Sequence, residues 1–315
     1  MGNPIVILVR SVETLPLEPP PLPPLPDPPP PRRRLHVILF AATFVTLTMA
    51  GAWFWADTGL TGFGWEMLSP HVLVQGLPYA LLVLLILGAH EFGHYFACQY
   101  YGVRATLPFF IPGFPMIIGT FGAVIRIRSQ IPSRRALFDI AAAGPIAGFA
   151  IALPVLAIGV AFAHPIPTTG EPHGVFLGPP LVSWLLERAF HGDANLQVGP
   201  IYGAAWVGML VTSLNLLPVG QLDGGHALFA VSPTLHRVVS WVTIASFAAF
   251  IAFEGIFART VSSYALWLVI LLVLRGRHPR LTDELSPLDG SRAAIGWALA
   301  LMLVLTFIPV PLQVV

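Results

Sequence analysis

The sequence predicts an all-α polytopic membrane protein with six to seven transmembrane helices and a short membrane-associated β-hairpin. Of its 315 residues, 56% are hydrophobic and only 10% are charged, whereas soluble domains carry about 25% charged residues. The mean hydropathy is +0.78, and several uncharged stretches reach the roughly 20 residues that span a bilayer. This composition excludes a water-soluble globular protein. The net charge of +1 argues against nucleic acid as a partner.

The N-terminal residues 1–34 form a Pro-rich cytoplasmic tail in this interpretation. Between Pro16 and Pro31, 11 of 16 residues are Pro, which favours an extended polyproline II segment without backbone donors for a core. We expect a solvated extension, with a ligand for a Pro-reading domain as the alternative. The apolar run Ile5–Val9 is too short for a signal-peptide core, so no cleaved targeting segment is expected.

The first predicted transmembrane helix is Leu35–Trp55, which has 21 residues without a formal charge. The other full-length candidates are Leu73–Tyr101, Ala136–Ala163, Val198–Leu217, Val238–Phe257 and Ala293–Val310. A further stretch, Val261–Leu274, has only 14 residues and is marginal as a span. The predicted number of spans is therefore six or seven.

The distribution of Arg residues predicts the orientation, because cytoplasmic loops near span ends are enriched in them. With seven spans and a cytoplasmic N-terminus, 14 of the 16 Arg residues lie on the cytoplasmic side, and only Arg188 and Arg259 lie outside. The sequence contains no Lys. We therefore expect a multi-pass integral membrane protein with a cytoplasmic N-terminus, in a bacterial cytoplasmic membrane.

Two connections between the predicted spans carry structure of their own. In the connection Gly102–Pro132, Arg and Ile alternate within residues 123–128, which is strand periodicity and predicts a hairpin in or on the membrane. The outer connection His164–Gln197 contains the apolar patch Leu181–Leu186 with Trp184. This patch predicts an interfacial helix.

The second predicted span contains His90-Glu91-Phe92-Gly93-His94. Residues four apart share a helix face, so the two imidazoles can bind one metal ion, with Glu91 placed to act as general base on a water molecule beside it. A chance match or an interhelical hydrogen-bonding cluster is the alternative. Three ionisable groups within five residues of an apolar span are costly to bury, which favours a metal site.

A catalytic zinc site normally has three protein ligands and one open position. Asp223 is the preferred third ligand, because it follows the fourth full-length span in a stretch broken by Pro218 and reaches the same side of the membrane as His94. His226 and Cys98 are the alternatives. Cys98 continues the stripe of imidazoles along its helix, but cysteines also commonly pack between helices.

Asp139 stands at the start of the third span, beside Arg134 and Arg135. Such a position is typical of a helix cap or of a charge at the membrane interface. We therefore do not expect Asp139 to bind the metal ion.

Three motifs together resemble the site-2 protease family of intramembrane zinc metalloproteases. They are His90-Glu-x-x-His94, Gly144-Pro145-Ile-Ala-Gly148, and Asn215-x-x-Pro218 followed by Leu222-Asp223-Gly224. The resemblance covers about residues 80–230. It implies that His90, His94 and Asp223 hold one zinc ion, that Glu91 is the catalytic acid/base and that Asn215 lies near the reacting carbonyl.

The resemblance also predicts the domain organisation. Residues 35–315 would form a polytopic membrane metalloprotease domain with its catalytic core at about 72–230, and the chain leaves no room between its spans for the PDZ domain of other family branches. The segment Gly119–Ser129 looks like the membrane hairpin of the branch with chloroplast and cyanobacterial members. The glycines of residues 144–148 would place the third span against its neighbours by close packing.

The predicted activity is hydrolysis of peptide bonds in or near transmembrane segments of membrane protein substrates. A strand around Gly122–Arg128 would capture the unwound substrate by strand addition. Two alternatives are a metal-ion transporter, which would repeat polar groups along a path across the membrane, and a catalytically inactive binder of membrane segments. An intact Glu91 argues against the inactive binder.

Overall fold

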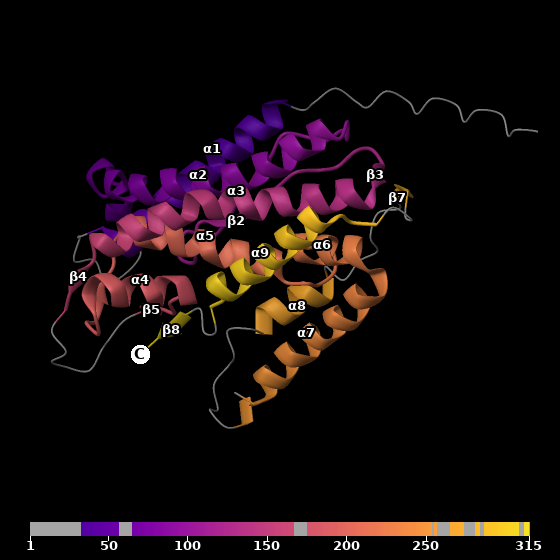
Figure 1. Cartoon of the computed structure of the whole chain (residues 1–315). Helices are drawn as coiled ribbons and strands as arrows, with labels where there is room; N and C mark the ends of the chain where they lie inside the picture. Colours follow the sequence, from indigo (N-terminus) through magenta and orange to yellow (C-terminus); the bar gives the residue numbers. More distant parts are fainter. Residues whose placement is uncertain are drawn as a thin grey trace, which may run out of the picture. The chain divides into compact units, whose positions relative to one another are not determined.

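The structure is a computed structural model that describes residues 33–56, 65–166, 175–253, 255–256, 265–273, 281–283, 287–308 and 312–314 (Figure 1). Residues 1–32 of the Pro-rich tail lie outside the described residues, as do parts of the predicted span Val261–Leu274. The described chain is mainly helical, as the composition predicted.

Four helices are long and apolar enough to cross a membrane: α1 (Arg33–Trp55), α2 (Pro70–Tyr100), α3 (Arg134–Ala161) and α7 (Pro233–Phe253). They coincide with four of the predicted spans to within a few residues, which supports a membrane protein. Helices α5 (Pro200–Leu216) and α9 (Gly290–Thr306) have 17 residues each, about 25 Å against a hydrocarbon core of about 30 Å. The count of six to seven spans is therefore not confirmed.

Three further helices are short. They are α4 (Leu181–His191), α6 (Asp223–Val231) and α8 (Ala265–Val273), and the 3₁₀ helix η1 (Trp65–Leu68) precedes α2. Helix α4 contains the predicted helical patch and extends it by five residues. The region of the marginal seventh span contributes only α8 to the described chain.

The long helices α1, α2 and α3 run side by side, and α5 packs against α2 and α3 (Figure 1). Their shared core includes the buried side chains of Leu47, Tyr79, Leu156 and Met209. Helix α7 instead contacts α6 and α8. The layer of α1, α2, α3 and α5 is thus the main packed body of the membrane domain.

The strands form four two-stranded pairs in the described chain. Three pairs are antiparallel: β1 (Phe109–Pro112) with β2 (Thr120–Val124), β4 (His164–Pro165) with β6 (Leu196–Gln197), and β5 (Val175–Leu177) with β8 (Leu312–Val314). The fourth pair, β3 (Ile131–Ser133) with β7 (Leu281–Asp283), is parallel. The first pair confirms the predicted hairpin.

The predicted strand over residues 123–128 is wrong in its extent, because β2 ends at Val124. The side-chain hydroxyl of Thr106 accepts the hydrogen bond from the Arg126 N–H at 3.0 Å, in place of a backbone carbonyl. Ile127 then forms only an isolated bridge with Ala105. The alternating residues thus lie along the hairpin without continuing its regular ladder.

Helices α1 and α2 hold the tip of the hairpin. The Thr46 hydroxyl of α1 donates to the Gly119 carbonyl at 2.7 Å, and the Tyr79 hydroxyl of α2 donates to the Ile118 carbonyl at 2.8 Å. Gly119 has φ of +86°, and a Cβ there would come within 2.7 Å of the Thr46 carbonyl oxygen. Only glycine fits this close approach.

Candidate metal centre

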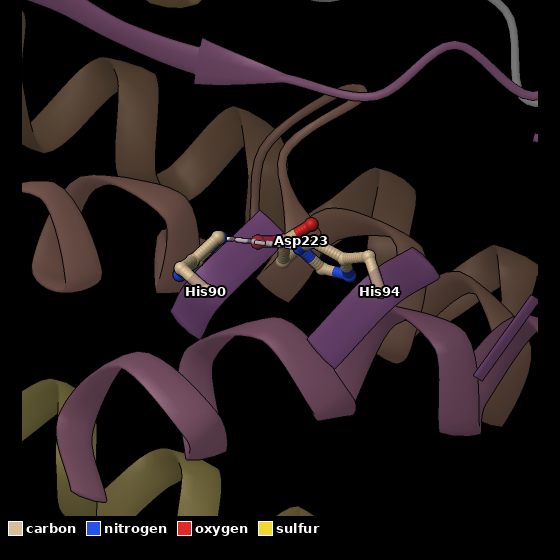
Figure 2. Close-up of side chains that lie close together, drawn as sticks. All are labelled: His90, His94 and Asp223. Carbon is tan, nitrogen blue, oxygen red and sulfur yellow. Dashed lines mark hydrogen bonds and ion pairs between the residues drawn. The ribbon is translucent and has the colours of Figure 1, made fainter. Parts of the chain in front are cut away.

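Three side chains from two separate parts of the chain converge on one point. His90 and His94 lie one turn apart on α2, and Asp223 begins α6 (Figure 2). The Nε2 atoms of the two imidazoles are 3.1 Å apart, and each lies 3.2 Å from Oδ2 of Asp223. The three atoms therefore form a nearly equilateral triangle.

This triangle fits a tetrahedral metal ion. Metal–ligand bonds of 2.0 Å in a tetrahedron place ligand atoms about 3.3 Å apart, close to the observed separations. Both histidines are buried, and Asp223 is 17% exposed in its side chain. Three protein ligands leave one position of a tetrahedron for water or substrate, as in catalytic zinc sites, whereas closed structural sites have four protein ligands.

The break in the chain after α5 brings Asp223 to this point. Helix α5 ends at Leu216, two residues before Pro218, and the chain turns through Gly220, whose φ is +53°. Proline cannot continue the helical hydrogen-bond pattern. The Ser240 hydroxyl of α7 donates to the Pro218 carbonyl at 2.7 Å, which anchors the turn that presents Asp223.

Two glycines of α3 provide the space for the imidazoles. A Cβ at Gly144 would lie 2.1 Å from Nε2 of His94, and a Cβ at Gly148 would lie 3.1 Å from Cβ of His90. The predicted close packing of this motif is therefore confirmed. Its neighbours are the candidate metal ligands themselves, so the motif also shapes the site.

The outer nitrogen of His94 is fixed by α3. Nδ1–H of His94 donates to the Ile140 carbonyl at 2.7 Å, which leaves Nε2 as the atom with a free lone pair toward Asp223. Such a hydrogen bond orients metal-binding imidazoles in many proteins. The sequence could not reveal this partner, because it is a backbone carbonyl group and every residue has one.

Glu91 and Asn215 also lie at this site. Glu91 is buried, with the backbone N–H of Ile125 from the hairpin directed at its carboxylate and with His94 and Asp223 close enough to act on its charge. Nδ2 of Asn215 lies 3.2 Å from Nε2 of His90. The structure thus brings together all five residues that the sequence singled out, and it adds a contact from the hairpin.

The two alternative ligands do not join the triangle. Cys98 is buried in an apolar cluster with Val103 and Ile140. His226 lies near enough to interact electrostatically with Asp223, but it is not among the converging ligand atoms. Within the described residues, the triangle is the one group of three potential ligands, whereas a transport path would repeat such groups.

Of the two alternatives for Asp139, the helix cap is wrong. Ser133 caps α3 by accepting from the Ala136 N–H at 3.2 Å, so Asp139 is not the cap. Asp139 forms its ion pair with Arg292 of α9 instead of with the adjacent Arg134 or Arg135. On a helix, side chains one turn away point along the same face, but α9 comes close enough to offer a bidentate partner.

The fold and the ligand triangle define a polytopic membrane protein with a buried candidate metal centre. Residues 78–253 match Peptidase family M50. This match covers more than half of the chain, and the chain belongs to that family.

Several plant proteins are similar to the chain. "Probable zinc metalloprotease EGY2, chloroplastic" of Arabidopsis thaliana is 32% identical over 247 residues, which are 76% of this chain and 43% of that protein. "Probable zinc metalloprotease EGY1, chloroplastic" of the same plant is 37% identical over 172 residues, which are 52% of this chain and 31% of that protein. The chain thus spans less than half the length of these curated relatives.

Proposed function

We propose that the protein is an intramembrane zinc metalloprotease of the site-2 protease type, which hydrolyses peptide bonds in or near transmembrane segments. The observation that carries the proposal is the triangle of His90, His94 and Asp223, buried in an apolar helical body with Glu91 beside it. Membership of Peptidase family M50 and the names of the plant relatives support the same activity. The cofactor is one zinc ion.

The proposed ligands are His90, His94 and Asp223, and the proposed general base is Glu91. Zinc, when bound, acts as a Lewis acid that polarises the scissile carbonyl and activates water at neutral pH. Glu91 accepts a proton from the attacking water and delivers it to the leaving amine, so that one water is consumed and a carboxyl group and an amine are formed. The Ile125 N–H holds the Glu91 carboxylate in position.

Asn215 is proposed to donate a hydrogen bond to the reacting carbonyl oxygen. Its side-chain amide lies beside His90. There, its N–H could donate to the carbonyl oxygen of the substrate as that oxygen gains negative charge. The metal-ion transporter is not favoured, since neither the family nor the single ligand cluster of the described chain supports it.

The hairpin is proposed to capture the substrate. A transmembrane helix must unwind before hydrolysis because its carbonyl groups are hydrogen-bonded internally, and strand addition to β2 would supply replacement partners. Phe121 and Val124 of β2 are exposed, and the hairpin reaches Glu91 through Ile125. Substrates with Gly, Asn or Pro near the cleavage site are therefore expected.

The remaining proposals concern organisation and location. We assign residues 1–34 to a cytoplasmic tail and 35–315 to the membrane metalloprotease domain, with the catalytic core at about 72–230. The Arg distribution supports a cytoplasmic N-terminus. The chloroplast relatives do not support a bacterial cytoplasmic membrane, so that location rests on the sequence alone and is tested by fractionation of the source cells.

The experiment compares the purified wild-type protein with Glu91→Gln in detergent micelles. The substrate is a transmembrane peptide with a Gly-Asn pair, and cleavage is read by mass spectrometry. Glu91→Gln should bind zinc as the wild type does and lose cleavage, because the amide cannot accept the proton. Equal cleavage by both proteins, or none by a zinc-loaded wild type, would contradict the proposed activity.

A second variant tests substrate capture. Val124→Pro removes a strand N–H and disturbs β2, so it should slow cleavage of the peptide while zinc binding stays at the wild-type level. Normal cleavage by Val124→Pro would refute strand addition and leave the assignment of Glu91 intact.

A further inference from the structure

The contacts between α2 and α3 run along both helices and end in a polar cluster near the start of α3. After the two glycine contacts with the imidazoles comes the Ile140 carbonyl, which accepts from His94. The adjacent residue of α3, Asp139, accepts a hydrogen bond from the hydroxyl of Tyr101, which directly follows α2. The register of the two helices is therefore set by polar groups next to the carbonyl that orients His94.

Arg292 of α9 binds both members of this cluster. Its Nε lies 2.9 Å from Oδ1 of Asp139, its Nη2 lies 2.5 Å from Oδ2 of Asp139, and the same Nη2 lies 3.2 Å from the Tyr101 hydroxyl. The side chains of Arg292 and Asp139 are only 18% and 24% exposed. A bidentate, shielded contact of this kind fixes geometry more strongly than a surface ion pair does.

Helix α9 also makes apolar contacts with the helices around the metal centre. Leu299 and Met302 of α9 are buried in one cluster with Leu137 of α3, Leu216 of α5 and Ala227 of α6. Arg292 thus projects from a helix that packs against α3 and α5, two of the elements around the site. It lies outside the residues 78–253 that match the family.

We propose that Arg292 is a positioning residue for the metal centre. By binding Asp139 and Tyr101, Arg292 keeps the Ile140 carbonyl in contact with Nδ1 of His94. This inference rests on the proposed function, because it takes His94 as a metal ligand. It assigns α9 a part in the metal centre, although α9 lies outside the residues that match the family.

Arg292 can affect the position of His94 but has no comparable route to His90. Nδ1 of His94 has the Ile140 carbonyl as partner, whereas Nδ1 of His90 is buried without a hydrogen-bond partner in the described part of the chain. Loss of an outer partner of a metal-binding imidazole typically weakens metal affinity by about 10- to 100-fold. Removing Arg292 would leave the Asp139 carboxylate partly buried without its cation, and the start of α3 would then shift.

The test measures zinc affinity of the full-length protein by competition with a chromophoric chelator. Arg292→Ala should weaken zinc binding by about tenfold, at the low end of the range for outer partners. Arg292→Lys should lose less, since Lys keeps the charge but cannot contact both carboxylate oxygens and Tyr101 in the same planar geometry. The lysine variant remains informative if the alanine variant fails to fold.

The matched control is Arg188→Ala. Arg188 also pairs with an aspartate, Asp193, but their side chains are 55% and 77% exposed, so zinc affinity should not change. Thermal unfolding of each zinc-free variant measures its stability separately. Wild-type zinc affinity in both Arg292 variants, whatever their stability, would overturn the positioning role.

His94→Ala distinguishes this outcome from failure of the proposed function. If His94→Ala binds zinc as tightly as the wild type does, the ligand assignment itself is wrong. If His94→Ala loses zinc while both Arg292 variants retain it, the ligand assignment stands and only the positioning role fails.

Discussion

The α2–α3 pair and helix α7 are all apolar enough to cross a membrane, but they differ in how they are packed. In the most apolar window of α2 and of α3, 44% of the residues are buried, against 17% in α7. Backbone atoms approach closely between α2 and α3, where a Cβ at Gly93 would lie 2.5 Å from the Ala143 carbonyl oxygen. Large apolar side chains are exposed on all three helices, and those of α7 include Val238, Val242 and Phe250.

The difference shows that hydropathy alone does not separate a helix that builds a site from one that faces lipid. Lipid tails are as apolar as the side chains of α7, so many different apolar residues are tolerated on a surface that faces lipid. Between α2 and α3, small residues are required wherever an imidazole or a carbonyl occupies the space. Substitutions of the same size should therefore have very different effects in the two regions.

The largest effect is expected for Gly144→Ala. The added methyl group would stand 2.1 Å from Nε2 of His94, so the imidazole must leave its position in the triangle. Zinc affinity should fall by about 100-fold or more, beyond the effect of losing an outer partner. Chelator competition measures this change.

Gly199→Ala is the matched control, because no atom lies within 4 Å of a Cβ added at Gly199. Its zinc affinity should equal that of the wild type. The same affinity in both glycine variants would show that the α2–α3 contact has more room than the structure describes.

A smaller effect is expected for Tyr79→Phe. This variant keeps the buried ring and loses only the hydrogen bond to the Ile118 carbonyl at the hairpin tip. We expect a loss of about 1 kcal/mol in the free energy of unfolding and a lower cleavage rate with unchanged zinc affinity. Val242→Ala on exposed α7 should change stability by less than about 0.5 kcal/mol; equal losses would remove the contrast between the regions.

The smallest effect concerns the start of α9. Hydrogen bonds from the Ser291 hydroxyl and the Arg292 N–H, together with the Arg292 charge, lower the pKa of Asp289 from 3.8 to about 2. Because the folded pKa lies below the unfolded value, this stabilisation is present above pH 3.8 and is lost as the pH falls through about 2.

Asp289→Asn tests this charge, since Asn also caps helices. The variant should unfold at a slightly lower temperature than the wild type at pH 6, and the difference should disappear toward pH 2. A difference that stays constant over this pH range would assign the effect to packing instead of charge.

The candidate site could be predicted from the sequence because its ligands follow local rules. The spacing of His90 and His94 places both on one helix face, and Pro218 indicates the break that frees Asp223. The predicted span Val198–Leu217 matches α5 to within two residues. Whether Val261–Leu274 crosses a membrane could not be predicted, because its 14 residues are marginal for a span.

The contacts around the site were also beyond the sequence. The partners at Ile125 and Ile140 are backbone groups, which every residue offers equally. The ion pair of Asp139 with Arg292 was not predicted, because only tertiary packing brings these two distant residues together. Strand periodicity at residues 123–128 was real, but the Thr106 side chain interrupts the ladder that it indicated.

The length of α2 determines how far water must travel. With 31 residues, an upright α2 is about 46 Å long and exceeds the hydrocarbon thickness of about 30 Å. Trp65, which is 89% exposed just before α2, is typical of a residue at the membrane–water boundary. If such an upright α2 enters the hydrocarbon core near Pro70, the roughly 20 residues that follow cross about 30 Å, which would place His90 near the opposite boundary. In the proposed protease, water would then reach the site from the adjacent headgroups, and a peptide bond would be cut where its segment emerges from the bilayer.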